Sequence, residues 1–461
     1  MCEGLRYNEG MSIADDTIVA IATARGQAGV AVIRISGREA WDIAWEVFSK
    51  KNITFQHGRF YHGWVVDEDG ANIDEVLMLM FRGPKSYTGE DVVEIHCHGG
   101  DIIPQKIVSL CCKLGARRAD PGEFTKRAFL NGKMDLTQAE SVMDLVSARS
   151  ERLLTQASAN LRNRSLGQYI DDMSRELLDL QARIVASIDF PDEVDEPDRE
   201  SIRKALVATI GHVARLRESA MRGRLVREGV KVALLGMPNS GKSSLFNALL
   251  ASERSIVTSQ AGTTRDAVSE SLEIDGIMVT LIDTAGIRET RHSIEVMGIE
   301  RSWQAASEAN LVLYLIDTSV GLLRYDHQVL SRLNPDNIII VGNKKDIKRA
   351  DSKVHPDWIY ISARTGEDIQ RLMEVLADKV RNITHEESDL GISLNDRQIA
   401  CCMALEKCLL QAYKALDNDG MPLDIVTVPM TDALLKIDEL MGRDTSEEVL
   451  SEVFKRFCVG K

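Results

Sequence analysis

The sequence lacks several features that would place it in common protein classes. It has eight cysteines but no C-x-x-C pair, which excludes a zinc ribbon and a thioredoxin-type dithiol. No apolar run approaches the roughly 18 residues of a membrane-spanning helix, and the first residues show no basic segment followed by an apolar one. We therefore expect a cytoplasmic protein that does not associate with membranes.

The sequence also lacks an excess of basic residues. Its formal net charge is −14, from 56 Lys and Arg against 70 Asp and Glu. A protein that binds nucleic acid over a broad face usually carries a basic excess. Any RNA must therefore bind to a local patch, or with the help of a partner.

At 461 residues the chain is too long for one ordinary domain, and its pattern changes along its length. Short β-branched runs between helices predict an α+β domain over residues 1–126. A helical period follows over 127–228 and returns over 383–461, while 229–382 alternates strands and helices. The fold class is therefore multidomain α/β and α, with an α/β domain inserted into a helical one. Helix spacing alone does not show whether the two helical segments pack together.

Five apolar runs in the inserted domain predict the strands of a mostly parallel sheet. They are Lys231–Leu235, Ile277–Ile282, Leu311–Ile316, Ile338–Val341 and Trp358–Ile361.

The first of these runs leads into a phosphate-binding loop. The loop, Gly236 to Ser243, has the form G-x-x-x-x-G-K-S and precedes a helical run. Its glycines let backbone N–H groups point at a phosphate, and the helix N-terminus adds positive potential. Lys242 is expected to span the β- and γ-phosphates, and the Ser243 hydroxyl to ligate Mg²⁺.

Three later motifs complete the pattern of a GTPase. Asp283 to Gly286 reads D-x-x-G, where Asp283 can hold a magnesium-bound water. Asn343 to Asp346 reads N-K-x-D, and the Asp346 carboxylate can accept two N–H bonds from guanine that adenine cannot offer. Ile361 to Ala363 is expected to reach the base O6 through backbone N–H groups. The predicted GTP-binding residues are Asn239, Ser240, Gly241, Lys242, Ser243, Ser244, Thr258, Thr263, Thr264, Asp283, Thr284, Ala285, Gly286, Asn343, Lys344, Asp346, Ser362, Ala363 and Arg364.

One position departs from the commonest GTPase pattern. Ile287 follows the D-x-x-G motif where Ras-type enzymes place a glutamine that orients water, and isoleucine has no polar atom for that role. Asn239 and the carbonyl groups of residues 258–266 could instead hold a monovalent cation beside the phosphates. An ordinary hydrogen bond within the loop explains Asn239 equally well. Thr264 is the expected second protein ligand to Mg²⁺.

Further motifs are spread over the whole chain, and with them the sequence resembles the MnmE family (also called TrmE) of tRNA-modification GTPases. They are Ile33–Gly37, Thr88–Glu94, His98–Gly100, Pro121–Phe124, Arg127–Leu136, Ile188–Glu193 and Phe457–Lys461.

The resemblance implies a layout of three domains. An N-terminal α+β domain would bind 5-formyl-tetrahydrofolate, or a related one-carbon folate, and form a homodimer. A central helical domain would carry an inserted Ras-like P-loop GTPase domain. The implied folate-binding residues are Arg34, Glu94, Lys133 and Lys461.

The resemblance also implies how the catalytic residues are arranged. The potassium ligands would be Asn239, Thr258, Gln260 and Thr263. Glu295 would act as a general base through a bridging water, and Lys242 would contribute to catalysis at the phosphates. Cys458 would lie towards the one-carbon unit and take part in the modification chemistry, although an ordinary residue at a helix end is the alternative.

Two functions from different classes follow. The first is a potassium-activated GTPase that needs GTP and Mg²⁺ and acts with an FAD-dependent partner resembling MnmG (GidA), as a heterotetramer. Together they would install a carboxymethylaminomethyl- or aminomethyl-type group at C5 of the wobble uridine of certain tRNAs. The second is a nucleotide-gated ribosome-assembly GTPase with no modification chemistry. The folate motifs and Cys458 favour the first.

Overall fold

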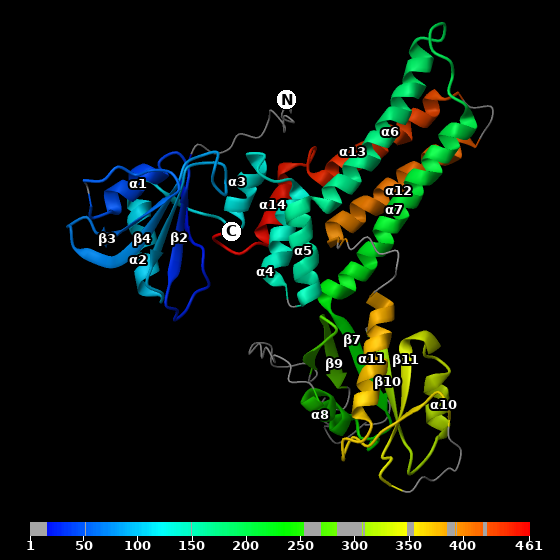
Figure 1. Ribbon diagram of the computed structural model, residues 1–461. Helices are drawn as coiled ribbons and strands as arrows, with labels where there is room; N and C mark the ends of the chain where they lie inside the picture. Colours follow the sequence, from blue (N-terminus) through cyan, green and yellow to red (C-terminus); the bar gives the residue numbers. More distant parts are fainter. Residues whose placement is uncertain are drawn as a thin grey trace, which may run out of the picture. The chain divides into compact units, whose positions relative to one another are not determined.

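The computed structural model describes residues 16–50, 52–148, 150–252, 269–283, 307, 309–347, 355–384, 392, 394–417 and 422–461 (Figure 1). The chain divides into two compact units. One unit comprises Met1–Val146, Ser158–Val213 and Ala400–Lys461, and the other comprises Ser147–Ala157 and Ala214–Ile399. Each unit is described by itself.

The N-terminal part of the first unit is built on a six-stranded sheet. Its strands are β1 (Ile18–Ile21), β2 (Ala31–Ser36), β3 (Arg59–Val66), β4 (Asn72–Phe81), β5 (Val92–Cys97) and β6 (Arg117–Arg118), in the spatial order β3-β4-β5-β2-β1-β6. All neighbours are antiparallel except β1 and β6. Helices α1 (Ala40–Val47) and α2 (Ile102–Lys113) share the apolar core with one face of this sheet.

The hairpin of β3 and β4 has a weak strand signal in the sequence. Its residues alternate only weakly in polarity, because Phe60 and Trp64 face solvent on the same side as His62. Gly63 faces the core instead, where a Cβ atom would meet the ring of Phe48. An apolar outward face removes the period-2 contrast that identifies a strand.

The described chain between the two sheets, and after the second, is helical, and several of its helices contribute residues to both units. The helices of the chain from residue 123 to 228 are α3 (Glu123–Leu130), α4 (Leu136–Ser147), α5 (Glu151–Asn163), α6 (Ser165–Asp189) and α7 (Arg199–Glu228). Those after the inserted domain are α12 (Asp396–Leu416), α13 (Asp424–Met441) and α14 (Glu447–Lys455). Among the described residues, no helix is both long and apolar enough to cross a membrane.

The two helical segments pack together. Helix α6 lies against α13, where the Gln181 amide donates to Thr431 Oγ1 at 2.6 Å. Arg443, just after α13, pairs with Asp171 of α6. Contacts between residues more than 240 positions apart therefore confirm one helical domain that carries an insertion. The expected boundaries at residues 126 and 382 fall inside α3 and α11 (Ile369–Thr384), so each helix continues past the position where the sequence pattern changes.

The second unit contains the inserted domain, a second six-stranded sheet. Its strands are β7 (Val230–Gly236), β8 (Ser269–Ile274), β9 (Ile277–Asp283), β10 (Leu311–Asp317), β11 (Ile338–Asn343) and β12 (Ile359–Tyr360), in the order β12-β11-β10-β7-β9-β8. Helices α8 (Lys242–Ser252), α10 (Arg324–Leu330) and α11 accompany it.

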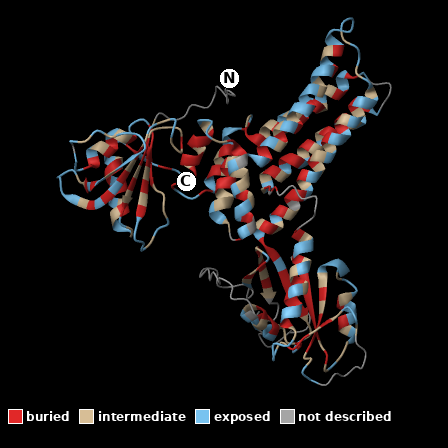
Figure 2. Ribbon diagram, viewed as in Figure 1, coloured by how far each residue is buried: buried red, intermediate tan, exposed pale blue. Residues whose placement is uncertain are grey.

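This sheet matches the predicted strands closely. Only β8 is antiparallel to its neighbour, and it is the one strand that the sequence pattern did not predict. The strands at the centre are buried almost throughout, which suits apolar runs without polar alternation (Figure 2). The carboxyl ends of β7, β10 and β11 meet at one edge of the sheet, where ligands bind in folds of this type.

Candidate functional site

The phosphate loop joins the end of β7 to the start of α8. Gly236, Asn239 and Gly241 have φ of 142°, 63° and 97°, in the left-handed region. Glycine tolerates these angles, and asparagine tolerates the smallest of them better than most residues. Lys242 Nζ donates to the carbonyl oxygens of Gly236 and Met237 at 2.9 and 3.0 Å. The ammonium group is therefore held over the loop, where a phosphate oxygen can replace a carbonyl.

Asn343 connects this loop to the base-recognition segments. Its Nδ2 donates to the Ser240 carbonyl at 2.7 Å, and its Oδ1 accepts from the Ala363 N–H at 3.0 Å. The Asn343 side chain lies so close to Gly241 that a Cβ atom on Gly241 would be 2.2 Å from Asn343 Nδ2. Sequence reasoning grouped Asn343 with the nucleotide contacts, whereas its amide joins three motifs to one another.

The residues predicted to bind guanine lie on two neighbouring loops. Asp346 Oδ1 accepts a hydrogen bond from Ser362 Oγ at 2.6 Å, and Arg364 Nε lies 3.7 Å from Asp346 Oδ2. The bond from Ser362 and the nearby cations lower the pKa of Asp346, so it stays ionised as an acceptor for two N–H groups.

Lys344 takes part in the same loop through an ion pair. It has a φ of 68°, and its Nζ lies 2.6 Å from Asp317 Oδ2 at the end of β10. Burial alone would raise the pKa of Asp317, but the hydrogen bonds from Lys344 and Ser319 together outweigh it and the pKa is lowered. The pair fixes the loop that carries Asp346.

Ser362 and Ala363 are expected to contact the base O6 through their backbone N–H groups. In this structure both N–H groups donate to acceptors within the chain. The Ala363 N–H is bonded to Asn343, and the Ser362 N–H donates to the Glu367 carbonyl at 3.1 Å. The motifs predict which N–H groups lie near the base, whereas the structure shows where these groups donate within the chain.

The remaining predicted nucleotide residues are only partly within the described structure. Ser243 and Ser244 lie in the first turn of α8, and Asp283 ends β9, paired in register with Leu234 of β7. Ser240 is buried, and its Oγ has no hydrogen-bond partner among the residues that the structure describes. The predicted residues outside the described ones are Thr258, Gln260, Thr263, Thr264, Thr284, Ala285, Gly286 and Glu295.

A second cluster forms on the N-terminal sheet around Arg34. Arg34 on β2 and Glu94 on β5 are directly opposite in register, and Arg34 Nε and Nη2 lie 2.9 and 2.8 Å from Glu94 Oε1. The guanidinium carbon lies 5.0 Å from the centre of the Tyr87 ring and 5.7 Å from that of Phe124. Two residues that the resemblance groups together are thus in contact.

His96 belongs to the same cluster, although sequence reasoning did not identify it. It lies two residues after Glu94 on β5, and its Nε2 is 3.6 Å from Glu94 Oε2. This nitrogen is buried and makes no hydrogen bond within the described structure. A buried polar atom without a partner next to a carboxylate suggests a place for a ligand group. The i, i+2 spacing on a strand was the available signal.

The last residues of the chain reach this cluster. The Gly460 carbonyl lies 3.5 Å from Arg34 Nη1, and the Cys458 carbonyl accepts from the Gly122 N–H at 3.5 Å. The Cys458 side chain is exposed, and Lys461 is half-buried. Lys133 Nζ donates to the Pro84 carbonyl at 2.8 Å and is not in hydrogen-bond contact with Arg34 or Glu94.

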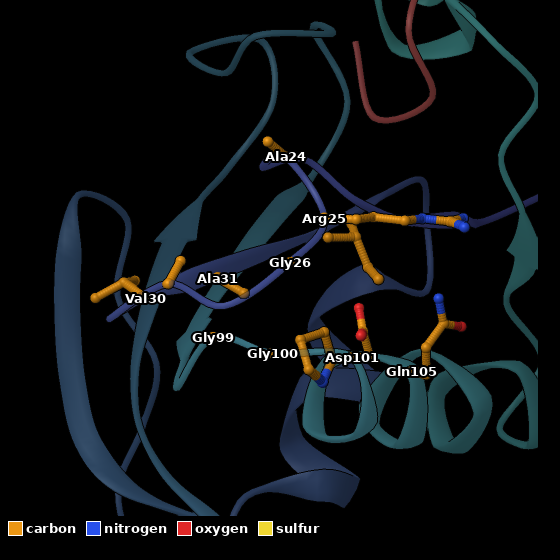
Figure 3. Close-up of a pocket in the computed structure, with 12 residues that line it drawn as sticks. Ala24, Arg25, Gly26, Val30, Ala31, Gly99, Gly100, Asp101 and Gln105 are labelled. Carbon is orange, nitrogen blue, oxygen red and sulfur yellow. The ribbon is translucent and has the colours of Figure 1, made fainter. Parts of the chain in front are cut away.

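A cavity of about 230 Å³ lies beside strands β1 and β2 of the N-terminal sheet (Figure 3). It is lined by the loop between β1 and β2, including Arg25, and by Gly99, Gly100, Asp101, Pro104 and Gln105 at the start of α2. Ile21 lines it too, and a Cβ atom on Gly460 would lie 2.3 Å from the Ile21 carbonyl oxygen. None of the predicted folate-binding residues lines this cavity.

Comparison with known proteins decides which family these sites belong to. A family model for the N-terminus of the GTP-binding protein TrmE matches residues 17–133, and one for the MnmE helical domain matches residues 136–458. The tRNA modification GTPase MnmE of Fervidobacterium nodosum is 38% identical over 461 residues, covering 98% of this chain and 99% of that protein. The chain belongs to the MnmE family. Another MnmE, from Synechococcus sp. (strain JA-3-3Ab), is 41% identical over 454 residues, covering 97% of this chain and 98% of that protein.

Solved structures were compared as well. Era of Aquifex aeolicus bound to GDP·AlF4⁻ aligns with 42% of this chain and 69% of its own at 28% identity, with a TM-score of 0.26. That score carries no argument about this chain, so membership of the MnmE family rests on the family models and the relatives.

Proposed function

We propose that this chain is a potassium-activated GTPase that, with an FAD-dependent partner, modifies C5 of the wobble uridine of certain tRNAs. The group installed would be of the carboxymethylaminomethyl or aminomethyl type. Family membership and the phosphate loop support GTP hydrolysis. The observation that carries the modification chemistry is the position of Cys458, an exposed thiol whose chain segment contacts the Arg34–Glu94 pair.

The residues of the phosphate loop would bind and orient GTP. Lys242 would exchange its bonds to Gly236 and Met237 for bonds to phosphate oxygens, without leaving its place over the loop. Asp346, kept ionised by Ser362, would accept the N1–H and N2–H₂ groups of guanine. The Ser243 hydroxyl, and Thr264 from outside the described residues, would hold Mg²⁺.

The phosphate loop also suits a monovalent cation. Asn239 lies within the loop that would bind the phosphates, and its φ of 63° is in the left-handed region. Bound potassium would supply positive charge at the leaving phosphates, where an arginine finger acts in other GTPases. Thr258, Gln260 and Thr263 would complete its ligands, and Glu295 would act as the general base through a water.

The N-terminal cluster would bind the one-carbon folate. Glu94 is an acceptor for the N–H edge of a pterin, and the unpartnered His96 Nε2 adds a second polar group beside it. Arg34, Lys133 and Lys461 would attract the glutamate tail. We further propose a homodimer through the N-terminal domain, and a heterotetramer with an MnmG-like partner.

Two measurements test this function. We expect GTP turnover at equal ionic strength to be at least tenfold faster in KCl than in NaCl, and equal rates would contradict the potassium mechanism. The variant Cys458→Ser should retain GTP hydrolysis while wobble-uridine modification is lost. Normal modification by that variant in cells lacking the native protein would refute the role of the thiol.

A further inference from the structure

One motif of the family, Ile188 to Glu193, lies far along the chain from both sites and has no role in the function proposed above. It ends α6, where the Phe190 N–H bonds to the Ala186 carbonyl at 3.0 Å. The Phe190 carbonyl accepts from the N–H groups of Glu193 and Val194 at 3.1 and 2.9 Å. The turn is therefore held by backbone hydrogen bonds, yet the Phe190 side chain is 57% exposed.

Exposed apolar side chains continue from Phe190 along both α6 and α13. Gln181 and Thr431 are the residues that join these helices, at 2.6 Å. The positions three before and four after each of them lie on the same side of their helix. All four positions carry exposed apolar residues: Leu178 and Val185 on α6, Val428 and Leu435 on α13.

These residues face solvent on one side of the line of contact between the helices. The buried residues of α6, such as Leu177 and Ile184, and those of α13, such as Met430 and Ile437, lie on the other side of that line. Ile188, two turns after Gln181, extends the apolar row towards Phe190. We call Leu178, Val185, Ile188, Phe190, Val428 and Leu435 the α6–α13 seam. Isolated exposed apolar residues are common, but a continuous row on two helices indicates an interaction surface.

Several carboxylates that form no ion pair within the described part of the chain lie beside residues of the seam. Asp189, Asp192 and Glu193 flank Phe190 in the chain, and Asp424 and Asp432 lie one turn of α13 before and after Val428. The basic residues Arg175, Arg183 and Lys436 on these helices are each already paired with a carboxylate. The seam therefore combines an apolar centre with a negatively charged rim.

The charge decides which class of molecule can bind. RNA is a polyanion and would be repelled by this rim. A second copy of the seam would bring the same carboxylates against it. A protein face with an apolar centre and a rim of Arg and Lys would be complementary in both respects.

We propose that the α6–α13 seam is the docking surface for the FAD-dependent partner, with Phe190 as an aromatic anchor. This rests on the proposed function, which supplies the partner. The apolar row would provide the contact that slows dissociation, while the carboxylates would accelerate association with a basic face.

The test measures binding of the purified partner to the full chain by surface plasmon resonance. The variants Val428→Lys and Phe190→Ala should each weaken binding at least tenfold, because the first places a cation against a basic face and the second removes the anchor. Met403→Lys is the matched control, since Met403 is an equally exposed apolar residue on α12 and lies off the seam. It should bind as the native chain does, and all three variants should hydrolyse GTP at the native rate. The double variant Asp189→Lys, Glu193→Lys should also slow association more at low salt than at high salt.

The outcomes separate the two proposals. If the native chain binds the partner and the Val428→Lys and Phe190→Ala variants bind it equally well, the seam proposal is wrong and the proposed function stands. If those variants keep the partner but lose tRNA, the seam is an RNA surface and the proposal is also wrong. If the native chain itself fails to bind the partner, the proposed function is wrong at that point.

Discussion

Asn343 shows how one side chain can join two loops of a candidate site. Its amide bonds to the Ser240 carbonyl and to the Ala363 N–H, so the phosphate loop and the base-recognition loop share one support. The motif that contains Asn343 predicts a nucleotide site, but only the structure shows which atoms it joins. The support leaves no space beside Gly241, and a substitution there tests it directly.

We expect Gly241→Ala to weaken GDP binding at least tenfold. The new methyl group would lie 2.2 Å from Asn343 Nδ2, and a φ of 97° is strained for alanine by about 1–3 kcal/mol. Isothermal titration with GDP and urea unfolding measure the two effects. Gly211→Ala is the control, because it lies within α7 with nothing within 4 Å of the new methyl group, and we expect it to stabilise the helix slightly. Native GDP affinity in Gly241→Ala would show that the loops are not held in this way.

The described cysteines should differ sharply in reactivity. Burial raises the pKa of Cys97 to about 11 and that of Cys111 to about 12, whereas Cys458 is exposed. Only thiolate reacts readily with iodoacetamide, so at pH 8 we expect Cys458 to be alkylated first. Mass spectrometry after short labelling times checks the order. Labelling of Cys111 before Cys458 would contradict the burial seen here.

At the scale of elements, α3 is fixed to the N-terminal sheet by a buried arginine. Arg127 lies 2.6 Å from Asp16 and about 3 Å from both Glu90 and Glu123, and its side chain is only 4% exposed. The Arg127–Leu136 motif does not predict this, because Asp16 and Glu90 lie far from Arg127 in the sequence and only Glu123 is on the same helix. Removing Arg127 would take away the cation that faces Glu90 and leave Asp16 and Glu123 with Arg117 alone.

We expect Arg127→Met to destabilise the N-terminal unit by about 3–5 kcal/mol. Burial would raise the pKa of Glu123 and of Asp16, but hydrogen bonds from Arg117 and Arg127 outweigh it and lower both pKa values. Their stabilisation is therefore complete above the unfolded pKa values of about 4 and is lost as pH falls through the folded ones. Denaturant unfolding of native and variant chains from pH 7 to pH 3 measures this. A variant as stable as the native chain, with the same dependence on pH, would refute the role of Arg127.

The elements also show what sequence patterns can and cannot predict. Runs such as Leu311–Ile316 are apolar throughout because a central parallel strand is covered on both faces. An apolar run of this length predicts a buried strand from the sequence alone. Strand β3 has a weak signal because Phe60 and Trp64 place apolar groups in solvent. The pairing of α6 with α13 includes a hydrogen bond between Gln181 and Thr431, two polar residues that no periodicity selects. The G motifs are contiguous in sequence and could be predicted, whereas the contact of Gly460 with Arg34 joins residues 426 positions apart.

At the scale of the whole molecule, the two units have separate apolar cores. A ligand that binds one of them should therefore stabilise that unit selectively. At a free concentration of 100 times its Kd, GDP adds about 2.7 kcal/mol to the free energy of unfolding of the unit that contains its site. We expect GDP to slow hydrogen exchange in β7, β10 and β11 and to leave β2, β4 and β5 unchanged. Exchange measured by mass spectrometry, peptide by peptide, provides this comparison. Equal slowing in both sheets would show that the units do not open independently.

The shared support at Asn343 has a consequence for the timing of nucleotide exchange. Because Asn343 joins the phosphate loop and the base loop through bonds within the chain, little of the binding free energy is spent on ordering them. The rate of nucleotide binding should then be set by diffusion and by the electrostatic field around the loop. No slow conformational change should follow binding. In stopped-flow experiments with a fluorescent GDP analogue, the observed rate should rise linearly with nucleotide concentration. If it instead reaches a plateau, the loops would have to be shaped after the first contact.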